Sequence, residues 1–470
     1  MKKSLIFITV LFLSFSIFAQ SDDDLFGGSD DDFFADDSIV EVNDVSAKTD
    51  LSKGVIFDTG AIKVGGSLTA GITTNTVLYS PENRPLGENI YNSTLKPDLS
   101  AMLSVDARPT ETLRIYTKFG FAYPFKDSIS GYFRNGQEQE LIGLNADGTP
   151  IIGTKTTNSI VDWFKLKELF TDFSIKDTAF FRFGIHTVTW GTGYFFSPVS
   201  DMINTSSIDP ENPEKQVDGA LNLRTQIVFP NSQNCLWFYV IPSTNFQNQT
   251  AESYMRETAL AGKMDIVIGG WEFGLGGYYK YQNAPKAMFT ATGSLKKMSF
   301  YGEFVYSYGS AQEWGRKPDW DDKTSIIQAT VGLSYYWKEP MINFAAQYYY
   351  NGNTKDIPTS YVISGHNVAA MLSFGKLFNN KDFTASIFAM ANFGRVEMTS
   401  QEIANYKTYG LSETMLNAMT GTSLSATAML YYSPIKELKF GLGPSLTFKD
   451  FNNNPTVSLK LSGTFGGGKF

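Results

Sequence analysis

The chain has 470 residues, of which 18% are charged, 15% are aromatic and one is a cysteine. This composition excludes an intrinsically disordered chain, which is poor in aromatic residues, and a single cysteine excludes an internal disulfide framework. The net charge of −8 is uneven: residues 1–20 carry two lysines, residues 21–50 carry eleven acidic residues and one lysine, and residues 51–470 are therefore neutral.

The first twenty residues have the parts of a secretory signal peptide. Two lysines form a positive n-region, an apolar stretch runs from Leu5 to Phe18, and Ala19 offers a small residue for cleavage. We therefore predict a signal peptide over 1–19. An uncleaved anchor helix is the alternative, although the apolar stretch is short for a membrane span.

An acidic segment follows, in which a Ser-Asp-Asp-Asp-apolar-Phe unit occurs at 21–26 and again at 29–34. So many charges of one sign repel one another, and the segment has too few apolar residues to form a core. We predict that 20–56 is a disordered leader in the periplasm. A calcium site is not predicted, because consecutive aspartates lack the alternating ligand spacing of an EF-hand.

Beyond the leader, apolar and polar residues alternate with a period of two. At 112–124, for example, Leu113 and Ile115 share one phase, while Arg114 and Lys118 share the other. In a β-strand this alternation places the two sets on opposite faces. The predicted strands are 60–73, 97–107, 112–124, 162–174, 180–190, 219–229, 235–242, 256–268, 271–282, 286–296, 298–308, 325–337, 341–350, 365–374, 382–392, 423–432, 438–448 and 456–465.

The connections between these strands alternate in length. Short ones such as 269–270 separate long ones such as 125–161, 191–218 and 393–422. Short turns at one end, long loops at the other and an even strand number are typical of an outer-membrane barrel, which must close because hydrocarbon offers no partner for a sheet edge. We predict an all-β fold, a transmembrane antiparallel up-and-down β-barrel of about 18 strands over 57–470, with 16 or 20 strands as alternatives.

The chain ends on Phe470 after an alternating strand in which Phe465 is the last aromatic residue in phase. This ending resembles the assembly signal of bacterial outer-membrane barrels. Together with the signal peptide, the acidic leader and the barrel pattern, it makes the chain similar to porin-like outer-membrane β-barrel proteins of spirochaetes or other diderm bacteria. The resemblance implies an outer-membrane location, contact with outer-membrane lipid and recognition of the C-terminal strand by the barrel-assembly machinery. It is also compatible with a homo-oligomer.

A shorter motif lies at 184–193, where a glycine is followed after five residues by Trp-Gly-x-Gly and then by a loop with a proline and an aspartate. It is similar to a motif of uncharacterised outer-membrane barrel families. If this resemblance extends to the fold, the loop 191–218 turns inward as a constriction. The candidate constriction residues are Trp190, Gly191, Pro198 and Asp201.

Charged residues in the polar phase predict the character of the lumen, which in an eighteen-stranded barrel is an aqueous channel. Basic residues on four consecutive strands would form one wall and acidic residues the opposite wall, which favours anions. The alternative is that these charges only solvate the lumen or pair with loop acids. The candidate pore-lining residues are Arg114, Lys118, Lys165, Lys167, Arg182, His186 and Arg224 on the basic side and Asp265, Glu272 and Glu303 on the acidic side.

We therefore predict a channel for passive diffusion of small polar solutes. A structural or adhesive barrel that presents its extracellular loops is the first alternative, and a transporter of hydrophobic substrates is the second. We expect no enzyme, because His186 and His366 have no Ser or Asp nearby in a catalytic arrangement. No metal, cofactor or nucleic-acid partner is predicted, since two distant histidines and the lone Cys235 give no ligand spacing and no basic stripe is present.

Overall fold

A computed structural model describes residues 55–58, 60–79, 88, 90, 93–123, 134–144, 150–159, 164–176, 178–213, 217–243, 250–354, 364–394, 422–448 and 454–469. The predicted signal peptide, the predicted leader up to residue 54 and the terminal Phe470 lie outside these residues. No helix in the described ranges is long and apolar enough to cross a membrane.

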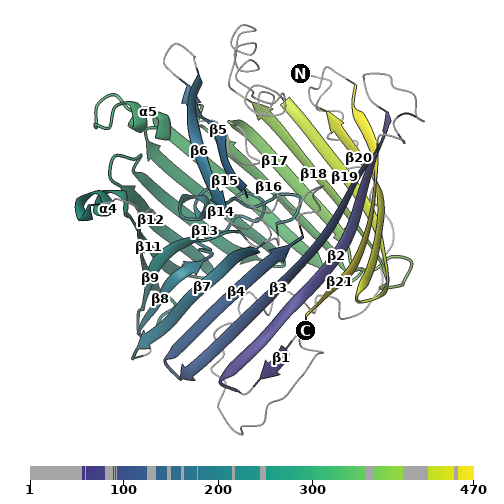
Figure 1. The fold of residues 1–470 in the computed structure, drawn as a ribbon, viewed down its shortest axis with the longest axis horizontal. Coiled ribbons are helices and arrows are strands. Elements are labelled where there is room, and N and C mark those ends of the chain that lie inside the picture. Colours follow the sequence, from purple (N-terminus) through teal and green to yellow (C-terminus); the bar gives the residue numbers. More distant parts are fainter. Residues whose placement is uncertain are drawn as a thin grey trace.

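Eighteen antiparallel strands form a closed barrel (Figure 1). Each barrel strand pairs with the next one along the chain, and the last strand, β21, pairs with the first, β2, which closes the barrel. The predicted fold class is confirmed. The barrel strands are β2 (Ile62–Tyr79), β3 (Thr94–Thr110), β4 (Leu113–Ala122), β7 (Phe164–Ile175), β8 (Ala179–His186), β9 (Ala220–Val228), β10 (Cys235–Ile241), β11 (Ala259–Ile268), β12 (Trp271–Lys280), β13 (Lys286–Leu295), β14 (Met298–Tyr308), β15 (Ser325–Trp337), β16 (Ile342–Asn351), β17 (Gly365–Phe374), β18 (Phe383–Gly394), β19 (Thr422–Ile435), β20 (Leu438–Phe448) and β21 (Thr456–Lys469).

The connections sort by length between the two ends of the barrel (Figure 1). Turns such as 269–270 and 296–297 lie at one end, which we call the short-turn end. Connections such as 187–219 and 309–324 start from the other, the long-loop end. Two short helices lie there, and a 3-10 turn lies within 187–219. They are α4 (Ala251–Glu257), α5 (Ala311–Arg316) and η4 (Ser200–Met202).

Several elements differ from the prediction. A hairpin of β5 (Arg134–Leu144) and β6 (Pro150–Ser159) occupies the connection expected to be a loop, and α4 delays the start of β11 to Ala259. The short strand β1 (Val55–Asp58) pairs with β2 next to the point where β21 ends, so it covers an edge of β2 that would otherwise stay open.

The two faces of the barrel wall differ in polarity. On the outer face, Leu275 is 66% exposed and Val331 is 58% exposed. On β14, Phe304 is 39% exposed on the outer face, whereas Glu303 and Val305 are at most 3% exposed on the inner face. Because apolar residues face outward on strand after strand, the outer surface suits a hydrocarbon environment.

Candidate functional site: a segment folded into the barrel

The strand β8 ends at His186 rather than at the predicted 190, and the chain then leaves the wall. We call the described residues of this connection, 187–213 and 217–219, the internal segment. Its residues Val188 and Trp190 are 2% exposed and pack in one apolar cluster with inward-facing residues of β10, β11, β13 and β14, among them Tyr239. The Trp190 and Tyr239 rings meet edge to face at 5.0 Å. This stretch therefore runs inside the barrel.

The middle of the internal segment continues along the inner wall. Phe195 is fully buried and Phe196 is 2% exposed, in a cluster with residues of β16, β17 and β18. The Phe195 ring lies 6.1 Å from that of Phe388 on β18, and the Phe196 ring stacks at 5.7 Å on Tyr349 of β16. The segment thus covers the inner face of the wall from β10 to β18.

Polar side chains of the wall bind the backbone of the internal segment. The Glu303 carboxylate accepts hydrogen bonds from the amides of Thr192 and Gly193, both at 2.6 Å, and from Val199 at 3.0 Å. It also accepts the Ser197 hydroxyl at 2.9 Å. Glu303 lies on β14, more than one hundred residues away along the chain, so these bonds fix the segment to a distant strand.

Two further wall residues add to this attachment. Gln347 on β16 accepts from the amide of Phe195 at 2.7 Å, and its own amide donates to the Phe196 carbonyl at 2.7 Å. Lys263 on β11 donates to the Trp190 carbonyl at 3.1 Å. Buried backbone groups that leave regular structure need such partners, because an unpaired one is costly.

All four candidate constriction residues lie in or at the start of this docked stretch. Trp190 and Pro198 are buried, and Gly191 donates its amide to the Ser200 hydroxyl at 2.9 Å. Asp201 keeps an exposed surface, but its carboxyl group is surrounded by protein atoms inside the barrel. The loss of water around this group, together with the nearby Glu303 carboxylate, raises the pKa of Asp201 from its ordinary 3.8 to about 7.

The candidate basic residues lie on the inner faces of β4, β7, β8 and β9, and acidic residues accompany them. Arg182 Nε lies 2.6 Å from Asp172 Oδ1, and its guanidinium carbon lies 4.0 Å from the centre of the Phe170 ring. Arg114 Nε donates to Asp106 Oδ1 at 2.9 Å. These wall acids, rather than Asp201, are the partners of the two arginines.

The lysines of β7 share a partner on the internal segment. Lys165 and Lys167 both donate to the Asp218 carboxylate. Burial opposes ionisation of Asp218, but the two ammonium groups outweigh it and lower its pKa. Lys118 stands opposite Glu168 in the register of β4 and β7. Lys165 remains 57% exposed, so this group of charges is accessible from the lumen.

The remaining basic candidates are Arg224, whose guanidinium lies 5.4 Å from a tryptophan ring of β10, and His186. His186 is 1% exposed and meets the Phe170 ring edge to face at 5.8 Å. His366 lies on the outer face, where its Nδ1 is 2.7 Å from the Tyr348 hydroxyl. The fold therefore places the two histidines on opposite faces of the wall.

Two of the three candidate acidic residues are covered by protein. Asp265 is 6% exposed, accepts a bond from Trp237 Nε1 at 2.7 Å and forms an ion pair with Lys263 at 2.9 Å. Glu303 lies beneath the internal segment. Only Glu272, on the inner face of β12, is half-buried rather than covered. The physical reason is that the segment docks on the strands that carry these acids.

The internal segment also reaches the opposite wall. Glu211 accepts a hydrogen bond at 2.8 Å from Lys460 on β21, and Lys460 lies 3.4 Å from the Thr427 hydroxyl on β19. The two side chains of the ion pair are 56% and 28% exposed. This ion pair is therefore solvent-exposed, in contrast to the buried contacts along β10 to β18.

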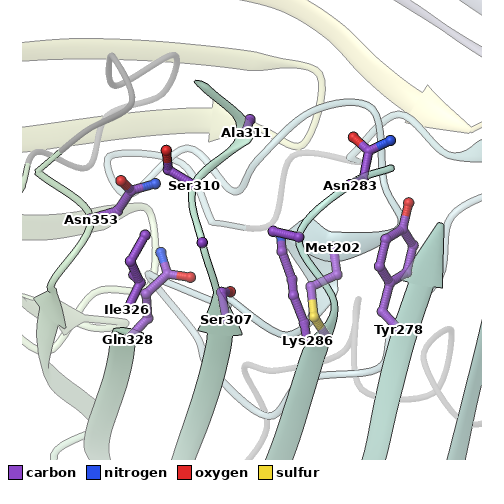
Figure 2. A pocket seen from close by; sticks show the side chains of 12 residues that line it. Met202, Tyr278, Asn283, Lys286, Ser307, Ser310, Ala311, Ile326, Gln328 and Asn353 are labelled. Carbon is purple, nitrogen blue, oxygen red and sulfur yellow. The ribbon is translucent and has the colours of Figure 1, made fainter. Parts of the chain in front are cut away.

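A cavity of about 220 Å³ lies between the internal segment and the long-loop end of the wall (Figure 2). Met202 of η4 contributes to its lining, together with Tyr278 at the end of β12 and Lys286 at the start of β13. Gln328 of β15 and Asn353 add amide groups. The cavity thus offers one cation and several neutral hydrogen-bonding groups beside the segment.

Two patterns in the sequence are consistent with the docking of the internal segment. Val188 and Trp190 continue the phase of Arg182 and are apolar in what is otherwise the polar, inward phase. On β14, the inward Glu303 likewise stands between the apolar residues Tyr301 and Val305. Apolar residues in the inward phase indicate a wall that is covered by protein rather than by water.

The sequence matches no protein-family model and no curated protein. Solved structures with some likeness include OpdO of Pseudomonas aeruginosa, 9% identical with a TM-score of 0.48 over 87% of this chain and 97% of that one. OpdK of the same organism, solved with vanillate, is 7% identical with a TM-score of 0.46 over 87% and 98%. OccAB3 of Acinetobacter baumannii is 11% identical with a TM-score of 0.44 over 86% and 98%. These likenesses are too distant to support an argument about function.

Proposed function

We propose that this chain is an outer-membrane channel through which small polar solutes diffuse passively, and that the internal segment narrows it. The observation that carries the proposal is a closed eighteen-stranded barrel with an apolar outer face and a segment docked along part of its inner face. A barrel of this size is too wide for its wall side chains to fill. The docked segment then takes up part of the lumen and leaves a passage beside it.

We infer a weak preference for anions in this passage. Basic residues of β4, β7 and β8 keep partial exposure, from 12% for Arg114 to 57% for Lys165. The acids Asp265 and Glu303 on the far strands are covered. Asp106 and Asp172 neutralise part of the charge of the basic residues. The net positive charge of this part of the lumen wall is therefore small.

The orientation follows from the sorting of the connections. The long-loop end faces outward and the short-turn end faces the periplasm, as in other outer-membrane barrels. The leader then lies in the periplasm next to β1, lipid contacts the outer face, and the assembly machinery recognises β21. The cavity beside Met202 and Lys286 lies at the outward entrance, where arriving solutes meet it first.

Planar-bilayer recordings on the refolded mature chain test this proposal. We expect discrete, ohmic conductance steps and a reversal potential displaced toward the anion in a salt gradient. Neutralisation of Arg182 and Arg224 together reduces this displacement, while the lysines of β7 keep part of it. A chain that inserts but does not conduct is a structural or adhesive barrel instead, and an unchanged reversal potential in the double variant overturns the anion preference alone.

A further inference from the structure

We propose that Glu303 is a positioning residue whose carboxylate, together with the amide of Gln347, holds the stretch Thr192–Val199 against the wall and thereby sets the width of the channel. This inference rests on the proposed channel function and adds the device that fixes the passage. Glu303 is on the wall, in the middle of β14, and is 3% exposed.

The hydrogen bonds at Glu303 are all of one kind. One carboxylate oxygen accepts the amides of Thr192 and Gly193 and the hydroxyl of Ser197, and the other accepts the amide of Val199. Every partner is a donor, which is the arrangement that an ionised, acceptor-only carboxylate requires. Among the described residues, no lysine or arginine forms an ion pair with Glu303. The internal segment itself therefore compensates this buried charge.

The glycines of the Trp-Gly-x-Gly motif fit the same contact. A Cβ atom added to Gly191 would collide with the Ser197 hydroxyl and with the Glu303 carboxylate, and one added to Gly193 would collide with the Phe196 carbonyl. The backbone can approach the carboxylate this closely only without a side chain at these positions. The motif and Glu303 therefore form one docking unit, although 111 residues separate Thr192 from Glu303.

Burial of the side chains around this docking unit fixes the internal segment to the barrel wall. Phe195 and Val199 have no exposed surface, and Phe196 is 2% exposed. Gln347 bonds both the amide of Phe195 and the carbonyl of Phe196, and it also donates to the Thr330 hydroxyl at 2.6 Å. Displacing the segment would break all of these contacts at once and leave the buried carboxylate without partners.

Three variants test the role of Glu303. E303A removes both carboxylate oxygens that accept hydrogen bonds from the segment. E303Q keeps one acceptor oxygen but places an amide NH2 against the Val199 amide. Gly191→Ala leaves Glu303 intact but adds a Cβ atom that prevents the segment backbone from approaching the carboxylate. The matched control is E272Q, which removes an inward-facing acid that makes no hydrogen bond to the segment in the described part of the chain. Unboiled gel mobility confirms that each barrel is folded.

The first readout is the accessibility of the wall beneath the segment. A cysteine is placed at Val305, which is fully buried in the cluster with Trp190, in a chain where Cys235→Ala removes the native thiol. We expect a membrane-impermeant maleimide to label it at least about tenfold faster when E303A, E303Q or Gly191→Ala is added, because the segment then detaches locally. E272Q leaves the labelling rate unchanged.

The second readout is single-channel conductance, which we expect to rise by about twofold in E303A and to stay at the parent value in E272Q. If E303A fails to fold, E303Q and Gly191→Ala provide the same comparison.

The proposal is overturned if the cysteine stays protected in every folded variant at Glu303 and Gly191, or if E272Q accelerates labelling equally. If the parent chain does not conduct, the proposed channel function is wrong. The labelling comparison still decides in that case whether Glu303 holds the internal segment against the wall.

Discussion

Asp201 and Glu303 are neighbouring carboxylates inside the barrel with different surroundings. Glu303 is covered and accepts four hydrogen bonds from the internal segment. Asp201 has an exposed surface, so in the proposed channel its charge would act on passing ions. The same chemical group is therefore fully hydrogen-bonded to protein at one position and exposed at the other.

If the barrel is the proposed channel, ionisation of Asp201 should make its ion selectivity depend on pH. Its pKa is raised to about 7, so the group is neutral below that pH and negatively charged above it. The reversal potential therefore shifts away from the anion as the pH rises from about 5.5 to about 8.5. Recordings across this range check the shift, and Asp201→Asn should abolish it. A pH dependence that persists in Asp201→Asn would assign the effect to another group.

Residue phases are predictable from the sequence, and residue partners are not. Alternation alone predicts the inward phase of Arg182 and Glu303, because each strand determines its own phase locally. The pairing of Arg182 with Asp172 depends on the register between two strands, and the covering of Glu303 depends on a segment more than one hundred residues earlier in the chain. Neither relation is present in the local pattern.

At the scale of elements, the internal segment has two differently attached halves. The first half, up to Ile203, is buried among side chains of β10 to β18. The second half reaches β21 through the exposed pair of Glu211 and Lys460. An exposed ion pair contributes only about 0–1 kcal/mol, so the second half is the more easily displaced.

Loss of the ion pair should therefore affect the current more than the stability. We expect Lys460→Gln to increase open-channel noise while changing the free energy of unfolding by less than about 1 kcal/mol. High salt should produce the same noise in the wild type, because it screens an exposed pair. Single-channel traces and urea titrations measure the two effects. Recovery of quiet traces when Lys460→Glu is combined with Glu211→Lys identifies the pair, and a noise-free Lys460→Gln contradicts this account.

Element positions follow closely from alternation where strands cross the wall. The strands β14, β15, β17 and β20 have the predicted bounds. The hairpin of β5 and β6 lies outside the barrel wall, where no bilayer requires an apolar phase, and its sequence shows none. β8 ends four residues early because Val188 and Trp190 pack inside the barrel, and such tertiary contacts override a local strand pattern.

For the whole molecule, the polarity of the two faces decides where the barrel can reside. Leu275 in the middle of β12 is 66% exposed on the outer face, and the inward Glu272 lies three residues away on the same strand. If the outer face contacts lipid, a charge at Leu275 must enter hydrocarbon. A charge at Glu272 enters a wet lumen instead.

We expect Leu275→Arg to destabilise the folded barrel by about 2–4 kcal/mol, the cost of an arginine near the bilayer midplane. Glu272→Arg serves as the matched control and should cost less than about 1 kcal/mol. Urea titrations of folding into lipid vesicles measure both values. Equal effects at the two positions would be inconsistent with a lipid-facing outer surface.

The central claim is that the barrel is an open channel with a fixed internal segment. Single-channel recording of the wild-type mature chain in a planar bilayer tests it most directly. The account predicts steady conductance steps of one size, with a linear dependence on voltage. Insertion of folded barrels without any conductance, or steps that open and close between several sizes in the wild type, would contradict it.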